Sequence, residues 1–151
     1  MIRVQREDFD IGAELARLTD GNTQVGGLAM FVGLVREIAP AGSTGSSAMT
    51  LEHYPGMTEK RLAEIEAEAR ARWPLDGVLI IHRHGRLEPG DRIVLVATTS
   101  SHRQAALESC AFLIDWLKTK APFWKLEESG GRAAWVEARE SDNQAAEKWK
   151  L

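Results

Sequence analysis

The chain has 151 residues, of which 44% are hydrophobic and 27% are charged, a balance typical of a soluble globular protein. Its formal net charge of −3 argues against a general nucleic-acid binder, and no apolar run is long enough to span a bilayer. The single cysteine excludes an internal disulfide and provides no metal cluster. We therefore expect one cytoplasmic domain over residues 1–151, with no signal peptide and no nucleic-acid or membrane partner.

The first two predicted elements precede a turn at residues 20–22. Ile2 and Val4 alternate with polar neighbours, which is typical of a short strand. Asp10 is a suitable N-cap for a brief helix, whose apolar side carries Ile11, Leu15 and Leu18.

Residues 25–35, VGGLAMFVGLV, are mostly apolar and contain three glycines. This pattern predicts a buried strand with a bulge or a close approach of another backbone segment. Arg36 follows directly, where the strand leaves the core. Residues 39–47, APAGSTGSS, are predicted to form a mobile loop, either a plain connection or a lid over the position of Arg36.

A strand, a turn and a helix are predicted next. Residues 48–53 have the composition of a strand, and Pro55 and Gly56 mark the turn. Thr58 is the predicted helix cap, and Pro74 ends the helix. Its inward face is predicted to comprise Leu62, Ile65, Ala69 and Trp73. Two further strands are predicted at residues 78–81 and 93–97.

The next predicted element is one long amphipathic helix within residues 101–125, SHRQAALESCAFLIDWLKTKAPFWK. Ser101 and Gln104 form a capping-box pattern, so we expect the helix to begin at His102. It should stop two or three residues before Pro122, which cannot continue it. The predicted buried stripe comprises Ala106, Leu107, Cys110, Ile114 and Leu117.

The C-terminal segment is predicted to contain a hairpin, formed by residues 123–127 and 133–137 around a Ser-Gly-Gly sequence. Ser141 or Asp142 could cap a last short helix that reaches Trp149. Because the strands come in pairs between helices, the sequence indicates an α+β chain rather than a regular βαβ fold.

Three basic residues are candidates for binding an anion. His102 and Arg103 stand at the positive end of the long helix, where added positive charge is locally unfavourable unless an anion compensates it. Together with Arg36 they would suit a phosphate or carboxylate, and the alternative is that they simply point into water.

Two lysines are the main candidates for proton transfer. Lys118 and Lys125 bracket a Pro-Phe-Trp sequence, and a lysine beside aromatic groups can act as an acid or base. The alternative is that both are ordinary surface lysines. His102 and Lys118 are 16 residues apart, about 24 Å along a helix. If both helix ends serve one site, a second copy of the chain must supply one of them, which predicts a homodimer with composite pockets.

Two other candidates are weaker. Cys110 lies on the apolar stripe, where a free cysteine usually acts as a small buried hydrophobe rather than as a nucleophile. His82 and His84 share a face of a predicted strand, but the sequence places no third metal ligand near them.

Four motifs carry a resemblance to a known family: LEHYPGMTEK at 51–60, SHR at 101–103, LKTKAPFWK at 117–125 and WVEARESD at 135–142. In this order they resemble the catalytic large subunit of molybdopterin synthase, the MoaE family. The resemblance implies an α/β-hammerhead fold with an additional β-rich subdomain.

The same resemblance implies an activity. Cyclic pyranopterin monophosphate would be converted to molybdopterin by insertion of two sulfurs as a dithiolene. The donor would be a thiocarboxylate on the C-terminal Gly-Gly of a small ubiquitin-like carrier. Two large subunits would form a homodimer within a heterotetramer, with no cofactor and no metal.

The resemblance also assigns roles to individual positions. Lys118 and Lys125 match the family's catalytic lysines. Leu34 and Leu126 stand where relatives can carry basic residues. The substrate-pocket positions of the family fall at Leu34, Val35, Arg36, His102, Arg103, Lys118, Lys125, Leu126 and Glu127.

Two hypotheses of other classes stay open on the sequence. The basic residues could hold a phosphorylated metabolite in a non-catalytic binding module. Alternatively, the chain could be a scaffold for a ubiquitin-like protein, with the lysines as docking charges. Binding without sulfur transfer would favour the first hypothesis, and salt-sensitive partner binding without pterin affinity would favour the second.

Overall fold

The computed structural model describes residues 1–37, 48–129, 132–136 and 140–150. In chain order the elements are β1 (Ile2–Gln5), α1 (Ile11–Thr19), β2 (Gly27–Leu34), β3 (Ala48–His53), α2 (Met57–Arg72), β4 (Gly77–Arg83), β5 (Gly85–Leu87), β6 (Arg92–Ser100), α3 (Arg103–Lys120), β7 (Phe123–Ser129), β8 (Arg132–Val136) and α4 (Glu140–Glu147). The predicted α+β class is confirmed. Within these ranges, none of the helices combines the length and the apolar character that crossing a bilayer requires.

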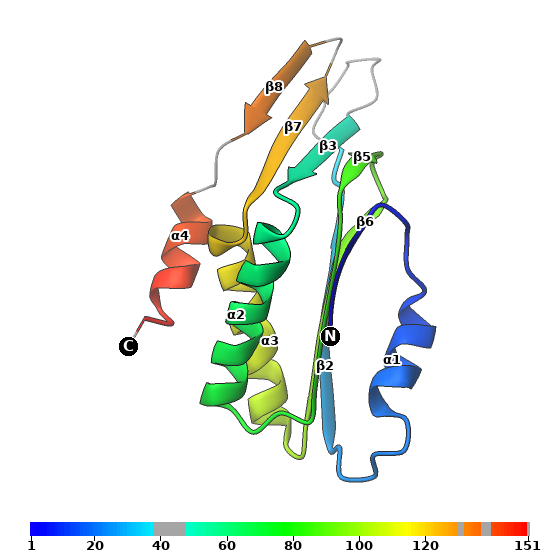
Figure 1. Ribbon diagram of the computed structural model, residues 1–151, viewed down its shortest axis with the longest axis vertical. Coiled ribbons are helices and arrows are strands. Elements are labelled where there is room, and N and C mark those ends of the chain that lie inside the picture. The colour runs from blue at the N-terminus through cyan, green and yellow to red at the C-terminus, as the bar shows by residue number, and fades with distance from the viewer. Residues whose placement is uncertain (38–47, 130–131, 137–139, 151) are drawn as a thin grey trace.

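The described strands form two four-stranded sheets. The first has the order β1-β4-β6-β2, with β1 parallel to β4 and the other neighbours antiparallel. Helices α2 and α3 cover one of its faces, and α1 covers the other (Figure 1). The second sheet, β5-β3-β7-β8, is antiparallel and lies beyond the end of the first sheet where α3 ends (Figure 1).

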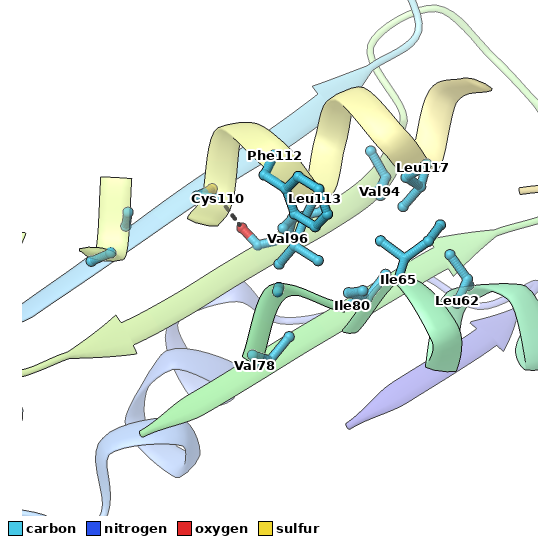
Figure 2. Packing of buried hydrophobic residues seen from close by; sticks show 13 residues of the cluster. Leu62, Ile65, Val78, Ile80, Val94, Val96, Cys110, Phe112, Leu113 and Leu117 are labelled. Carbon is cyan, nitrogen blue, oxygen red and sulfur yellow. Dashed lines mark hydrogen bonds between the residues drawn. The ribbon is translucent and has the colours of Figure 1, made fainter. Parts of the chain in front are cut away.

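The main hydrophobic cluster lies between the first sheet and the helices α2 and α3 (Figure 2). Phe112 and Leu113 of α3, Leu62 of α2, and Ile80 and Val96 of the sheet are fully buried there. Each such side chain contributes about 1.5–3 kcal/mol when it is removed from water. This cluster fixes α3 against the sheet, and therefore fixes the two ends of α3 that carry the candidate residues.

The buried stripe of α3 differs from the predicted one at Leu107. Ala106, Cys110 and Leu117 are buried as predicted, and Ile114 packs at the margin of the cluster. Leu107 is 61% exposed. The prediction was wrong there because consecutive residues of a helix point about 100° apart, and Ala106 already faces the sheet.

The N-terminus of α3 also differs from the prediction. The helix begins at Arg103, its N-cap is His102, and no side chain bonds to the free N–H groups at this cap. Gln104 instead donates a hydrogen bond to Glu108 (3.1 Å). The capping-box prediction was wrong because Ser101 lies one residue before the cap, too early for the pattern to close.

Strand β2 is an edge strand, whereas a buried strand was predicted. Among the described strands it pairs only with β6, and its register shifts between Gly33 and Leu34, which confirms the predicted bulge. α1 is only nine residues long and packs mainly on β4 and β6, so the β2 side of that face is less covered. The exposed large apolar side chains of β2 are Leu28, Met30, Phe31 and Leu34.

Two helix starts were misplaced by two or three residues. α2 begins at Met57, so Thr58 lies inside its first turn and its hydroxyl bonds to another segment of the chain. α4 begins at Glu140, so Ser141 and Asp142 lie within the helix instead of capping it. The predicted strands and the β7–β8 hairpin are confirmed, and the short strand β5 was not predicted. The predicted loop at residues 39–47 lies outside the described residues.

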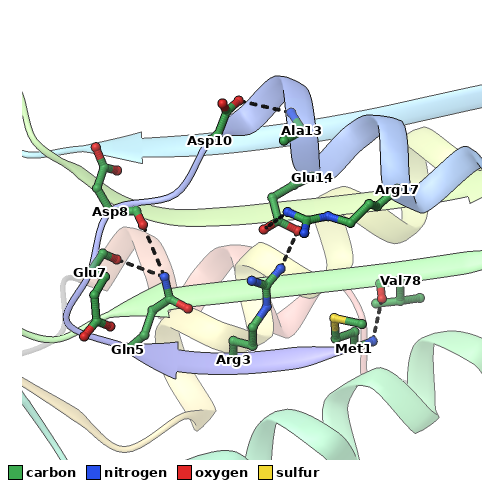
Figure 3. A network of polar contacts seen from close by, with 10 residues as sticks. All are labelled: Met1, Arg3, Gln5, Glu7, Asp8, Asp10, Ala13, Glu14, Arg17 and Val78. Carbon is green, nitrogen blue, oxygen red and sulfur yellow. Dashed lines mark hydrogen bonds and ion pairs between the residues drawn. The ribbon is translucent and has the colours of Figure 1, made fainter.

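Helix α1 is attached to β1 by a polar network (Figure 3). As predicted, Asp10 caps the helix, and its carboxylate accepts a hydrogen bond from the Ala13 N–H (3.0 Å). Glu14 is buried and accepts hydrogen bonds from Arg3 and, at 2.9 Å, from Arg17. Pairing with two guanidinium groups offsets the cost of burying this carboxylate.

Candidate functional site

Lys118 and Lys125 lie on the two arms of one corner of the chain. Only Ala121 and Pro122 separate α3 from β7. Lys118 is exposed in the last turn of α3, where a positive charge also stabilises the helix end, and Lys125 is half-buried near the start of β7. The Ala121 N–H donates to the Leu117 carbonyl (3.2 Å), which closes the last turn of the helix. The geometry of this corner therefore sets how the two lysines lie relative to each other.

A cluster of aromatic rings lies against this corner. His82 of β4 stacks on Phe123 of β7, with ring centroids 3.7 Å apart. His53 of β3 lies beside His84, with centroids 4.2 Å apart, and 6.5 Å from Phe123. His53 pairs with Phe123 across the two strands, and Lys125 follows Phe123 by two residues, so all three side chains lie on one face of the second sheet.

The electrostatics of this cluster keep its buried ring uncharged. Burial lowers the pKa of His82 to about 4, a hydrogen bond to the Arg83 carbonyl opposes this, and the positive charge of Lys118 adds to the lowering. Burial also lowers the pKa of His84, with a further contribution from His53. His82 is therefore a neutral imidazole at pH 7.

The geometry supports neither Cys110 as a nucleophile nor the histidines as metal ligands. Cys110 is buried, its Sγ lies 3.8 Å from the Val96 carbonyl (Figure 2), and burial raises the pKa of its thiol to about 11. A thiol in this state is a poor nucleophile, which supports the structural interpretation. In the described part of the chain, no three His, Cys, Asp or Glu side chains are arranged to hold a metal ion.

Arg36 lies at the same end of the first sheet as the corner. β2 and α3 both run antiparallel to β6, so the C-terminal ends of β2 and α3 lie at the same end of the molecule. Val35 is buried with Met49 and Leu51 of β3, whereas Leu34 and Arg36 on either side of it are exposed.

The second sheet connects this end to Lys125. Leu51 pairs with Lys125 and points to the same face, so the buried cluster around Val35 adjoins the strand that carries the lysine. Leu126 is half-buried on the opposite face of β7, and Glu127 pairs through its main chain with Met49. The structure thus gathers the predicted residues of β2, the end of α3 and β7 at one end of the chain.

His102 and Arg103 lie at the opposite end of α3, and both are exposed. The first turn of α3 has no acidic residue, and Arg103 forms no ion pair among the residues that the structure describes. The backbone of β2 passes close by: a Cβ added to Gly26 would lie 2.0 Å from the Ser101 carbonyl oxygen, and one added to Gly27 would lie 3.2 Å from the Arg103 Cα. This is the close backbone approach that the glycines predicted.

One chain therefore brings together only part of the predicted site. Arg36, Lys118 and Lys125 belong to one end, and His102 with Arg103 belongs to the other, about 22–24 Å away along α3.

The positions of Thr58 and His53 beside the corner were missed by sequence reasoning. Thr58 and His53 reach the corner from α2 and β3, and their roles depend on contacts between segments far apart in the sequence. The motif at residues 51–60 contains both residues and was the one available signal.

Comparison with known proteins gives a consistent result. Residues 4–120 match the family model of the MoaE protein. The molybdopterin synthase catalytic subunit of Mesorhizobium japonicum is 52% identical over 151 residues, which covers 99% of this chain and 92% of that protein. The chain belongs to the MoaE family. The resemblance inferred from the motifs is thereby confirmed.

Two solved structures have the same fold as this chain. The molybdopterin biosynthesis MoaE protein of Burkholderia ambifaria superimposes with a TM-score of 0.83 at 51% identity, covering 100% of this chain and 99% of that one. A chain from the complex of subunits 1 and 2 of the molybdopterin-converting factor of Helicobacter pylori superimposes with a TM-score of 0.72, covering 91% of both chains. That chain is 19% identical, so the likeness concerns the fold alone.

Proposed function

We propose that this MoaE-family chain is the catalytic subunit of a molybdopterin synthase. It converts cyclic pyranopterin monophosphate to molybdopterin by transferring two sulfurs, one from the C-terminal thiocarboxylate of each of two small carrier molecules. The observation that carries this proposal is the near full-length match to molybdopterin synthase catalytic subunits at about half of all positions. The lysine corner and the uncompensated basic helix end fit the chemistry that the reaction requires.

The basic residues supply the binding of the phosphorylated pterin. Arg103 and Arg36 can each form bidentate hydrogen bonds with phosphate oxygens, and the free N–H groups of the first turn of α3 add a positive potential. His102 stands at the N-cap of the same turn. The neighbouring positions Leu34, Val35, Leu126 and Glu127 complete the proposed pocket, with Leu34 and Leu126 contributing contact area instead of charge.

The lysines supply the charge stabilisation for sulfur transfer. The carrier brings its own sulfur nucleophile, so the enzyme needs no cysteine, and Cys110 can remain buried. Lys118 stabilises the negative charge that develops on the oxygen leaving the attacked carbon or on the acyl intermediate. Lys125 assists proton transfer or orients the tail of the carrier.

A homodimer completes the site. β2 is an edge strand with exposed apolar side chains, and such edges are normally covered. A second copy related by a two-fold axis beside β2 and perpendicular to the strand would run antiparallel to the first. It would bring the His102–Arg103 end of one copy beside the Arg36–Lys118 end of the other. Each composite pocket then contains His102 and Arg103 of one chain together with Arg36, Lys118 and Lys125 of its partner.

The remaining expectations belong to the same proposal. The carrier is a ubiquitin-like protein ending in Gly-Gly, and one carrier binds each end of the homodimer to form a heterotetramer. The superimposed Helicobacter pylori chain also comes from a complex of two different subunits. Residues 1–151 act as one cytoplasmic domain of the α/β-hammerhead type with a β-rich subdomain.

The direct test is an incubation of the purified chain with thiocarboxylated carrier and cyclic pyranopterin monophosphate, scored for dithiolene product. We expect product from the wild-type chain and none from Lys118→Ala, with the dimer still folded because Lys118 is exposed. Lys120→Ala, in the same helical turn, is the matched control and should retain activity. Normal product formation by Lys118→Ala would refute the role of this lysine. Pterin binding by the wild-type chain without any sulfur transfer would instead favour a non-catalytic binding module.

A further inference from the structure

The corner between α3 and β7 is held by two buried polar side chains that the proposed mechanism does not use. Both belong to elements other than the two arms of the corner: Thr58 lies in α2 and His82 in β4. Thr58 is 0% exposed and His82 is 5% exposed. A buried polar group weakens a fold unless its hydrogen bonds are satisfied, so the contacts of these two residues indicate what they do.

Thr58 ties the start of α2 to the corner. Its hydroxyl accepts a hydrogen bond from the Tyr54 N–H (3.0 Å) and donates one to the Pro122 carbonyl (3.1 Å). A hydroxyl has one hydrogen to donate, so this donation is committed to the corner. A backbone hydrogen bond also stabilises the corner: the Phe123 N–H donates to the Ala121 carbonyl (2.9 Å).

His82 supports the other side of the corner through its ring. The ring lies nearly parallel to that of Phe123, with an interplanar angle of 18°. Its Nδ1 lies 2.8 Å from the Arg83 carbonyl, which can only accept, so Nδ1 carries the proton and the ring plane is fixed.

The charged and titratable groups around His82 come from three elements. Lys118 of α3, His53 of β3 and His84, which follows β4, all disfavour a positive charge on the ring. An uncharged ring can remain stacked and buried beside Lys118 without repelling it.

We propose that Thr58 and His82 are positioning residues for sulfur transfer, which hold the Ala121–Phe123 corner so that Lys118 and Lys125 address the same reacting centre. This inference rests on the proposed function. Neither residue touches the substrate, and each acts through the corner. A displacement of about 1 Å in a catalytic group can reduce turnover about a hundredfold, so the loss of either contact should appear in kcat. Pterin binding should be unaffected, because His102 and Arg103 lie at the other end of α3 and the exposed Arg36 follows β2, outside both arms of the corner.

The first experiment compares Thr58→Val with Thr58→Ser in the complete complex of chain and thiocarboxylated carrier. Valine keeps the shape of the side chain but removes both hydrogen bonds, whereas serine keeps the hydroxyl. We expect Thr58→Val to lower kcat about ten- to a hundredfold with the KM for the pterin unchanged. Thr58→Ser should stay within about threefold of the wild-type kcat, since its hydroxyl can make both bonds. Ser109→Ala removes another fully buried hydroxyl, which bonds only within α3, and controls for a general loss of stability.

The second experiment tests the His82 ring independently of Thr58. It therefore still tests the positioning role if Thr58→Val does not fold. His82→Phe keeps an aromatic face for Phe123, and His82→Leu removes it. We expect His82→Phe to retain most of the wild-type kcat and His82→Leu to lose about tenfold or more, again without a change in KM. Equal kcat for the two His82 variants, or a wild-type kcat for folded Thr58→Val, would overturn the positioning role. If the wild-type complex makes no product, the proposed function itself is wrong. This outcome differs from the failure of the positioning role, in which the wild-type complex is active.

Discussion

The two ends of α3 are built in different ways. The C-terminal end continues into a corner that is fixed by buried contacts from α2 and β4, and its lysines extend from that fixed frame. The N-terminal end presents His102 and Arg103 to solvent, and the backbone of β2 passes close to it. Positioning by buried side chains suits a reacting centre, whereas an exposed basic helix end suits an anion that a second subunit helps to enclose.

The largest effect on stability should come from the N-terminal end. Gly26→Ala would place a Cβ 2.0 Å from the Ser101 carbonyl oxygen, and neither backbone can move without disturbing β2 or the start of α3. We expect a loss of about 3–4 kcal/mol in the free energy of unfolding, measured by urea denaturation. Gly12→Ala, in exposed helix α1, is the control and should be neutral or stabilising by up to about 1 kcal/mol. Equal stability of the two variants would mean that the close approach does not hold this end.

The C-terminal end should respond to acid. His82 has a lowered pKa of about 4 in the folded chain and an ordinary value of 6.5 when unfolded. Between these values the unfolded chain binds the proton and the folded chain does not, so stability falls as the pH decreases from 6.5 to 4 and this contribution levels off below 4. The loss should be about 3 kcal/mol, seen as the difference between the wild-type chain and His82→Phe in denaturation at several pH values. Parallel pH profiles of the two proteins would contradict this assignment.

Arg103→Ala should affect binding rather than stability. The side chain is exposed, so we expect a change of less than about 0.5 kcal/mol in the free energy of unfolding. Loss of charge-assisted hydrogen bonds to phosphate should weaken pterin binding about ten- to a hundredfold, measured by calorimetry. Lys118→Ala should bind the pterin about as well as the wild type. If Lys118→Ala weakened pterin binding and Arg103→Ala did not, the roles assigned to the two ends of α3 would be wrong.

The smallest effect is expected at Lys120. Its ammonium lies 4.6 Å from the centre of the half-buried Trp116 ring, in the last turn of α3, and Lys120 itself is exposed. Lys120→Ala should therefore cost about 0.5–1 kcal/mol in thermal denaturation and leave turnover unchanged. A loss of turnover equal to that of Lys118→Ala would show that general positive charge at this end matters more than one placed lysine.

Local patterns in the sequence were sufficient for the order of the elements. Asp10, the glycines of β2 and Pro122 each act on their immediate neighbours, and the cap, the bulge and the helix end that they predicted are present. The exposure of Leu107 could not be predicted, because periodicity gives a stripe but not its exact centre. The edge position of β2 depends on the pairing of distant strands, which an apolar run does not reveal.

The candidate site also has a part that local sequence patterns predict and a part that depends on distant contacts. The motifs pointed to Lys118, Lys125 and Arg103 as individual positions. The support from Thr58 and His82 arises only when α2, β4 and β7 meet, at sequence separations of 64 residues for the Thr58–Pro122 bond. Contacts between residues so far apart produce no regular spacing that could be recognised in the sequence.

The most direct test of a site shared between two chains is a mixed dimer of Arg103→Ala and Lys118→Ala subunits. At pterin concentrations well below the KM of Arg103→Ala, each variant alone should show almost no activity. In a mixed dimer one composite pocket combines the intact Arg103 of one chain with the intact Lys118 of the other, so an equal mixture should recover about a quarter of the wild-type activity. If each pocket were formed within a single chain, every pocket would carry one lesion, and the mixture would remain as inactive as its components.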